Sequence, residues 1–292
     1  MNGIVVKAIS GFYYVYSDKT TYECKARGSF RNSGASPVVG DYVDFSVLSD
    51  KNGVIQEIYP RKNFLDRPLI ANIDRIFIVS AFKTPSPDTY MIDLMSAICI
   101  YKKIEPVIVF NKSDMGSFEI FERIYRNSGL KTLTVSAKNK DNTESLNALT
   151  AGKVCAFIGN SGVGKSSLIN ALNADLMLKT GEVSEKLGRG RHTTRHTELF
   201  IRENGAFIVD TPGFSSLDIS DDPLGFRDNL PFCFPEFKNY LGLCRFSDCT
   251  HTTEPKCKIA EAVIKGEIED SRYESYKKIF SDLKAVKSWN LK

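Results

Sequence analysis

Long apolar runs are missing from this sequence. The longest ones, Ile76 to Phe82 and Met91 to Tyr101, fall well short of the roughly 18 residues that a membrane-spanning helix requires. The N-terminus also lacks the basic start and the small-residue cleavage site of a signal peptide. We therefore expect a cytoplasmic protein with no membrane partner.

Charge of one sign is also scarce. Lysine and arginine number 39 against 35 acidic residues, a net charge of +4, which by itself is weak support for a nucleic-acid partner. With 42% apolar residues among 292, the chain can fill buried cores, which excludes an intrinsically disordered protein. The sequence has no internal repeat. We expect a monomer of more than one domain.

An even set of cysteines, as in a disulfide framework, is absent, because the chain has seven. Cys24, Cys99 and Cys155 each stand alone in an apolar segment, which predicts small core residues in a reducing compartment. The other four lie between Cys233 and Cys257.

Residues 1–66 have the texture of an all-β domain. Clusters of Gly, Ser, Asn and Asp separate five short strands: Gly3 to Ile9, Phe12 to Tyr16, Thr21 to Ala26, Asp41 to Leu48 and Gly53 to Tyr59. This pattern predicts a small β-barrel that looks like an OB-fold, whose loops and sheet face often bind nucleic acid. Candidates for phosphate and stacking contacts are Phe12, Tyr13, Tyr14, Lys25, Arg27 and Arg31. Alternatively, the aromatic side chains belong to the barrel core.

Residues 67–222 alternate between strands and helices. Short apolar strands are expected at 75–80, 106–110, 132–136, 154–159 and 206–210, with helices near 89–102, 117–128, 142–150 and 165–173. This predicts an α/β domain on a mostly parallel sheet. Residues 223–292 are expected to form a third, mainly helical domain, with helices near 257–266 and 271–286.

A Gly-rich loop follows the strand at 154–159 and opens the next helix, which is the context of a phosphate-binding P-loop. Its backbone N–H groups would cradle a diphosphate, Lys165 would reach the β/γ oxygens as a catalytic residue, and the Ser166 hydroxyl would bind Mg²⁺. The expected nucleotide contacts are Gly159, Asn160, Ser161, Gly162, Val163, Gly164, Lys165, Ser166 and Ser167.

Asp210 ends a buried strand and begins the segment Asp210-Thr211-Pro212-Gly213. There its carboxylate would hold the Mg²⁺ water shell, and the Gly213 N–H would sense a γ-phosphate. The same four residues could instead be a simple β-turn.

A guanine-recognition pattern precedes the phosphate loop. The strand at 106–110 ends in Asn111-Lys112-Ser113-Asp114. The Asp114 carboxylate can accept hydrogen bonds from guanine N1–H and N2–H₂, which adenine does not offer, while Lys112 covers the base and Asn111 braces the loop. Ser136, Ala137 and Lys138, again at a strand end, could present a backbone N–H to guanine O6. These three residues alone also fit a plain loop.

A cluster of metal-ligand residues lies near the C-terminus: Cys244, Cys249, His251 and Cys257. Three thiolates and one imidazole make a closed, tetrahedral set for one structural Zn²⁺, with no open position for a substrate. Cys233 is a possible substitute ligand, and free cysteines are the alternative.

The nucleotide motifs together resemble those of the guanine-nucleotide-binding GTPases, but base recognition at 111–114 and 136–138 precedes the phosphate loop. This order is similar to that of circularly permuted GTPases. With a barrel before it and a Cys/His module behind, the whole chain resembles the ribosome small subunit-dependent GTPase family. The resemblance also includes the segment from Gly190 to Thr194. It implies the small (30S) ribosomal subunit and its rRNA as partners, and late subunit maturation as the function.

The segment before Asp210 is expected to be a switch loop. Thr194, with Thr193 as second choice, would complete Mg²⁺ coordination when γ-phosphate is present. Phe214 stands where many GTPases place a water-orienting Gln, and the resemblance implies that His192 takes that catalytic role. Alternatively, His192 binds RNA phosphate or nothing, with His196 as the weaker candidate. Lys186, Arg189, Arg191 and Arg195 would contact rRNA, compensate transition-state charge, or only be solvated.

These patterns predict a GTPase that uses GTP, GDP and Mg²⁺. The first alternative is an RNA-binding scaffold in which guanine nucleotide only stabilises the fold. The second is a P-loop ATPase or small-molecule kinase, against which Asp114 argues.

Overall fold

The computed structural model describes the whole chain except residues 29, 31–35, 84, 173–196, 211–215 and 286–292. The chain divides into two compact units, residues 1–75, 144–157 and 169–214 in the first, and residues 76–143, 158–168 and 215–292 in the second. In the described part of the chain, every helix is too short or too polar to cross a membrane.

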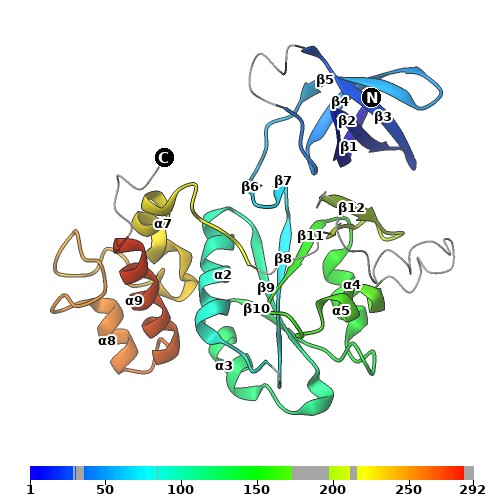
Figure 1. The fold of residues 1–292 in the computed structure, drawn as a ribbon. Coiled ribbons are helices and arrows are strands. Elements are labelled where there is room, and N and C mark those ends of the chain that lie inside the picture. The colour runs from blue at the N-terminus through cyan, green and yellow to red at the C-terminus, as the bar shows by residue number, and fades with distance from the viewer. Residues whose placement is uncertain (29, 31–35, 84, 173–196, 211–215, 286–292) are drawn as a thin grey trace. The chain divides into compact units, whose positions relative to one another are not determined.

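The N-terminal part of the first unit is the predicted barrel (Figure 1). Its strands are β1 (Asn2–Ile9), β2 (Phe12–Ser17), β3 (Thr20–Ala26), β4 (Tyr42–Ser49) and β5 (Asn52–Ile58). They follow the order β1-β2-β3-β5-β4, β3 and β5 run parallel, and the β1–β4 pairing closes the ring. This five-stranded arrangement is that of an OB-fold.

The barrel core consists of alternate residues of its strands. Its fully buried members are Val5, Val15, Cys24, Val43, Phe45 and Ile55. The period-2 alternation of a strand turns these side chains inward. Cys24 is therefore a core residue, as predicted, and Cys99 and Cys155 are equally buried in their own elements.

The rest of the first unit adds strands to β1. β12 (Glu198–Ile201) pairs with β1 opposite Lys7, whose ammonium lies 3.0 Å from the Glu198 carboxylate. β13 (Phe207–Asp210) joins β12 to β11 (Val154–Ile158), and α4 (Thr143–Thr150) precedes β11. The hairpin of β6 (Phe64–Asp66) and β7 (Leu69–Ala71) lies where the sequence predicts a domain boundary.

The second unit contains three strands of the predicted α/β domain. β8 (Arg75–Ala81), β9 (Glu105–Asn111) and β10 (Lys131–Thr134) lie in the order β10-β9-β8, and β10 and β9 are parallel. All seven residues of β8 are buried, as expected for a strand covered on both faces. α2 (Thr89–Tyr101) and α3 (Glu119–Asn127) lie on one side of these strands (Figure 1).

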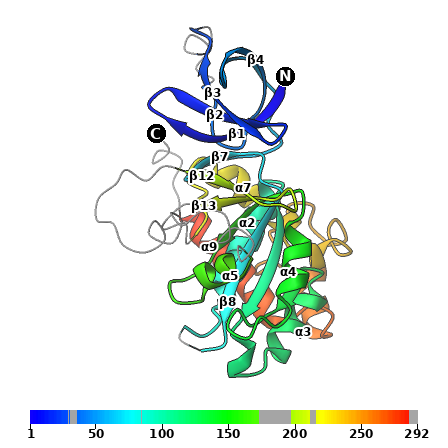
Figure 2. The same cartoon turned by 90° about the vertical axis from the view of Figure 1, so that its right-hand side faces the viewer.

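The C-terminal module of the second unit comprises short helices and one longer one. They are α7 (Pro223–Asn229), η3 (Leu230–Cys233), η4 (Pro235–Phe237), α8 (Lys258–Ile264) and α9 (Asp270–Lys284). α9 packs along α2 (Figure 2), and Tyr90 of α2 donates to Asp282 of α9 at 2.7 Å.

A buried guanidinium anchors α9 to α2. Arg272 donates to Asp93 of α2 at 2.6 Å and to Glu236 of η4 at 2.7 Å. The side chains of Arg272 and Asp93 are 1% and 0% exposed. The guanidinium also lies 4.5 Å from the ring centre of Phe234 and 5.8 Å from that of Tyr125. One buried cation thus pairs with two carboxylates from separate elements.

We predict that Arg272→Met lowers the free energy of unfolding by about 3–5 kcal/mol, because it leaves Asp93 and Glu236 buried without their cation. Urea denaturation measures this change. The matched control is Lys277→Met on the same helix, whose partner Glu274 is 66% exposed, so we expect a loss within about 1 kcal/mol. Equal losses in the two variants would contradict the anchoring role of Arg272.

Candidate functional site

The predicted phosphate loop connects β11 to α5 (Lys165–Leu172). Two of its glycines are required by their surroundings. Gly159 has φ +140°, and a Cβ there would lie 2.2 Å from the Val79 carbonyl oxygen. Gly164 has φ +94°, and a Cβ there would lie 2.3 Å from Nδ2 of Asn111. The loop therefore packs against β8 and β9 at distances that only glycine permits.

Lys165 is held over the loop by backbone carbonyls. Its ammonium donates to the carbonyl oxygens of Gly159 at 2.6 Å and Asn160 at 3.0 Å. Partial burial lowers the pKa of Lys165 below its ordinary value. Because an ammonium has three donors, this arrangement leaves one N–H for a phosphate oxygen. Ser166 and Ser167 are exposed in the first turn of α5.

The Asn111 side chain connects all three motifs of the second unit. Asn111 is 2% exposed at the end of β9. Its Nδ2 donates to the Val163 carbonyl oxygen of the phosphate loop at 2.9 Å. Its Oδ1 accepts from the Ala137 backbone N–H at 3.1 Å. Residues 111, 137 and 163 are thus joined by one carboxamide, which satisfies both ends of its polar group.

Asp114 lies beside Ser136, a link that the sequence analysis did not predict. Ser136 is buried, and its hydroxyl donates to Oδ1 of Asp114 at 2.7 Å. This hydrogen bond lowers the pKa of the exposed Asp114 carboxyl below its ordinary value. The side chain is therefore ionised at neutral pH and acts only as an acceptor. The spacing of the two motifs carries no signal for this contact.

The neighbours of Asp114 and Ser136 in the two base-recognition segments are Lys112, Ala137 and Lys138. Lys112 has a left-handed backbone, with φ +65°, and a half-buried side chain. The segment 136–138 is predicted to present a backbone N–H to guanine O6, and here the Ala137 N–H donates to Oδ1 of Asn111. Lys138 is exposed beside it.

Several predicted residues lie outside the described part of the chain. These are His192, Thr193, Thr194, Gly213, Phe214, the alternative His196, the barrel candidate Arg31, and the basic residues Lys186, Arg189, Arg191 and Arg195. Asp210 is the last residue of β13, in line with the prediction that it ends a strand. Magnesium binding by Asp210 remains a prediction.

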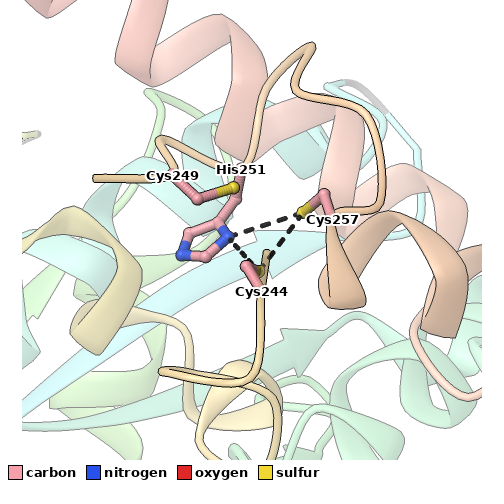
Figure 3. Close-up of side chains that lie close together, drawn as sticks. All are labelled: Cys244, Cys249, His251 and Cys257. Atoms are coloured by element: carbon pink, nitrogen blue, oxygen red, sulfur yellow. Dashed lines mark hydrogen bonds between the residues drawn. The ribbon is translucent and has the colours of Figure 1, made fainter. Parts of the chain in front are cut away.

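The predicted metal ligands of the C-terminal module converge (Figure 3). The ligand atoms of Cys244, Cys249, His251 and Cys257 all lie within 4.8 Å of one another. Nδ1 of His251 lies 3.5 Å from the sulfurs of Cys244 and Cys257, which are 4.0 Å apart. Cys233 is not a member of this cluster, because its buried thiol donates to the Asn229 carbonyl oxygen at 3.3 Å.

The cluster has the dimensions of a tetrahedral zinc site. Bonds of about 2.3 Å to sulfur and about 2.0–2.1 Å to nitrogen place two sulfurs about 3.8 Å apart, and sulfur and nitrogen about 3.6 Å apart. The observed separations of 4.0 and 3.5 Å match these values. Cys244, His251 and Cys257 therefore fit Zn²⁺ at these distances, and the Cys249 sulfur lies within 4.8 Å of the other ligand atoms.

Comparison with solved structures defines the class of the protein. The chain is similar to the crystal structure of YjeQ from Thermotoga maritima, with a TM-score of 0.84 and 35% identity over 98% of this chain and 99% of that one. It is also similar to YloQ, described as a circularly permuted GTPase, with a TM-score of 0.81 and 33% identity over 97% and 94% of the two chains. The fold is therefore that of a circularly permuted GTPase, as predicted.

Sequence comparison identifies the family. Residues 58–220 match the RsgA GTPase family, and residues 2–55 match the RsgA N-terminal domain. Two relatives named small ribosomal subunit biogenesis GTPase RsgA are each 42% identical. One is from Caldanaerobacter subterraneus, covering 97% of this chain and 96% of that protein, and one is from a Geobacillus species, covering 98% of both. The chain belongs to the RsgA GTPase family and is a GTP hydrolase.

We predict that Gly164→Ala lowers the affinity for GTP by roughly 100-fold, because the added methyl group displaces the Asn111 carboxamide and breaks buried hydrogen bonds. Titration with a fluorescent GTP analogue measures this. Gly152→Ala is the control, since Gly152 also has positive φ, +64°, but a Cβ there meets nothing within 4 Å. If both variants bind GTP alike, contact with Asn111 is not what GTP binding requires of the glycine at position 164.

Proposed function

We propose that this chain binds the small (30S) ribosomal subunit and its rRNA, assists late maturation of that subunit, and leaves after hydrolysing GTP to GDP and phosphate. The observation that carries the nucleotide part is the Asn111 carboxamide, which joins a phosphate loop to a guanine-recognition pair. The partner part is supported by the names of relatives that match almost the full chain, small ribosomal subunit biogenesis GTPases.

In this proposal guanine is read by one acceptor and one donor group. The Asp114 carboxylate accepts from N1–H and N2–H₂ of the base, and its contact with Ser136 supports an ionised, oriented acceptor. Lys112 covers the base plane. A backbone N–H of Ala137 or Lys138 binds O6, with the Ala137 donor exchanging its present Asn111 partner for the base.

The phosphates lie against the loop from Gly159 to Ser167. Lys165 is already oriented by two carbonyl oxygens, which supports a direct contact with the β/γ oxygens. Ser166 and Asp210, with Thr194 or Thr193, offer the hydroxyl and carboxylate oxygens that Mg²⁺ prefers. Mg²⁺ held by these residues would neutralise charge on the β- and γ-phosphates.

Hydrolysis replaces the bond between the γ-phosphorus and the bridging β–γ oxygen by a bond to water oxygen, and the products are GDP and phosphate. The attacking water needs a group that orients it, and Phe214 has no polar atom for this purpose. We assign the task to His192, whose imidazole can accept the proton of water near neutral pH. The Gly213 N–H senses the γ-phosphate.

The Cys244, Cys249, His251 and Cys257 cluster would bind one structural Zn²⁺. Three thiolates and an imidazole close the coordination shell, so the metal would stabilise the loop before α8 and take no part in hydrolysis. The fit of the interatomic distances supports this assignment.

The barrel would contact rRNA through the face formed by β2 and β3. Lys25 is exposed, and its ammonium lies 5.1 Å from the ring centre of Phe12. These two side chains line a hollow together with Gly11 and Phe30, which suits one phosphate and one stacked base. Tyr13 packs against the barrel core, so it is a weaker candidate for stacking.

The proposal also covers the cellular location, the oligomeric state and the domain boundaries of the protein. The protein would act in the cytoplasm, where small subunits mature, and it would act as a monomer. Its three domains would comprise residues 1–66, 67–222 and 223–292.

We predict that small ribosomal subunits accelerate GTP hydrolysis by the purified chain roughly tenfold or more, because no single residue of the sequence supplies both water orientation and an arginine finger. The measurement is phosphate release at fixed protein concentration and increasing subunit concentration. Large subunits and free rRNA serve as controls and should leave the rate unchanged.

The same assay separates the proposal from the scaffold alternative. His192→Ala should reduce the stimulated rate about 100-fold or more while leaving GTP affinity unchanged. If Lys165→Ala folds and keeps all nucleotide-dependent affinity for the subunit, the chain is a scaffold that nucleotide merely stabilises. No acceleration by small subunits, with tight GTP binding retained, would refute the proposed partner.

We predict that Asp114→Asn weakens GTP binding by about 100-fold, because a donor amide then faces the N–H groups of guanine. Xanthosine triphosphate, which has a carbonyl oxygen in place of the 2-amino group, should gain affinity in the same variant. Competition against labelled GTP measures both effects, and Asp141→Asn, an exposed neighbour, is the control. ATP competing as well as GTP with the unmodified protein would refute guanine selectivity.

A further inference from the structure

A single carboxylate organises the turn that carries His251. Oε1 of Glu254 accepts from the Thr250 backbone N–H at 2.8 Å and from the Thr250 hydroxyl. Its Oε2 accepts from the backbone N–H groups of Thr252 at 3.0 Å and Thr253 at 3.1 Å. The two oxygens therefore bind the residues on both sides of His251.

The conformation of His251 needs such support. Its φ is +59°, a left-handed backbone that costs a non-glycine residue about 1–2 kcal/mol. In this conformation Nδ1 of the buried ring faces the sulfurs of Cys244 and Cys257 at 3.5 Å. A residue held in a sparsely populated conformation persists only when its surroundings enforce it.

The same turn is held from its other side by α9. The Tyr276 hydroxyl donates to the Thr250 carbonyl oxygen at 2.6 Å, and the Tyr273 hydroxyl donates to that of Thr252 at 3.4 Å. Thr250 and Thr252 thus have their N–H groups bound by Glu254 and their carbonyl groups bound by α9. Of these three partners, only Glu254 belongs to the turn, and its carboxylate joins Thr250 to Thr252.

Glu254 could in principle be a zinc ligand, since carboxylates bind zinc. Its surroundings argue otherwise. Each of its oxygens already accepts two hydrogen bonds from the turn. Although burial disfavours the charged form, these donors lower the pKa of Glu254 to about 2. In the described structure the convergent ligand set is complete with four other residues.

We propose that Glu254 is the positioning residue of the metal site: it fixes the turn 250–254 so that Nδ1 of His251 faces Cys244 and Cys257, and it thereby sets how tightly Zn²⁺ is held. This inference rests on the proposed binding of zinc. Outer partners of metal ligands commonly change metal affinity by about 10–100-fold when they are altered.

The test compares Glu254→Gln with Glu274→Gln in the full chain. Gln has the shape of Glu but replaces one acceptor oxygen by an NH₂ donor, which then faces backbone N–H groups. Glu274 is a matched acid on α9 whose side chain is 66% exposed. Zinc transfer from the loaded protein to the chelator 4-(2-pyridylazo)resorcinol is followed by absorbance. We expect Glu254→Gln to release zinc about 10–100-fold faster, and Glu274→Gln to match the unmodified protein.

Cobalt substitution distinguishes positioning from ligation. If Glu254 only positions His251, the Co²⁺-loaded variant keeps the absorption bands of a Cys₃His site. If the unmodified Co²⁺-loaded protein instead has the weak absorption bands of a five-coordinate site, and the variant has those of a four-coordinate one, Glu254 binds the metal and the proposal is wrong. Glu254→Asp keeps the charge but is too short to bridge Thr250 and Thr252, so it should give an intermediate rate of zinc release. This variant replaces Glu254→Gln in the test if Glu254→Gln does not fold.

Two further outcomes separate this inference from the proposed function. Release of zinc at the unmodified rate by the Glu254 variants would overturn the positioning role and leave the zinc site intact. Absence of zinc from the unmodified, purified chain would refute both the zinc assignment and this inference. The GTPase part of the proposed function would be unaffected, since subunit-stimulated phosphate release tests it independently.

Discussion

The nucleotide site depends on the carboxamide of Asn111. This one group donates to the Val163 carbonyl and accepts from the Ala137 N–H, so it fixes the distance between the phosphate loop and both base-recognition segments. Its burial makes each of these hydrogen bonds costly to lose. Gly164 follows from the same constraint, because any side chain at that position would occupy the space of the amide. Circular permutation leaves this geometry intact, since the contact joins segments in space, whatever their order along the chain.

The C-terminal module depends on α9 in a similar way. The helix makes two sets of polar contacts. In the first, the Arg272 guanidinium binds Asp93 of α2 and Glu236 of η4. In the second, the hydroxyls of Tyr273 and Tyr276 donate to backbone carbonyl groups on either side of His251. The helix therefore connects a GTPase-domain helix to the metal cluster through polar groups that are removed from water. Removing one partner of such a buried ion pair leaves an uncompensated charge and is strongly destabilising.

Much of the fold was predictable because its signals are local. Most elements show a periodic pattern of apolar residues within their own sequence, and the structure places them within a few residues of the expected positions. These are the barrel strands, β8 to β11, α2 to α5, and α9. The strands that the sequence analysis missed are short. β6, β7 and β12 have three or four residues each, too few for a period to be visible, and they exist because a partner strand supplies the hydrogen bonds.

The sequence by itself determined the chemistry of the chain: the phosphate loop, the guanine-recognition residues, their permuted order, and the three cysteines and one histidine. Residue type and spacing carry that information, because each motif is contiguous. Only the tertiary structure decided that Ser136 orients Asp114, that Nδ1 of His251 faces the thiols, and that Arg272 is buried between two carboxylates. These contacts join residues far apart in the chain or depend on a left-handed turn. Their energies arise only when folding removes both partners from water.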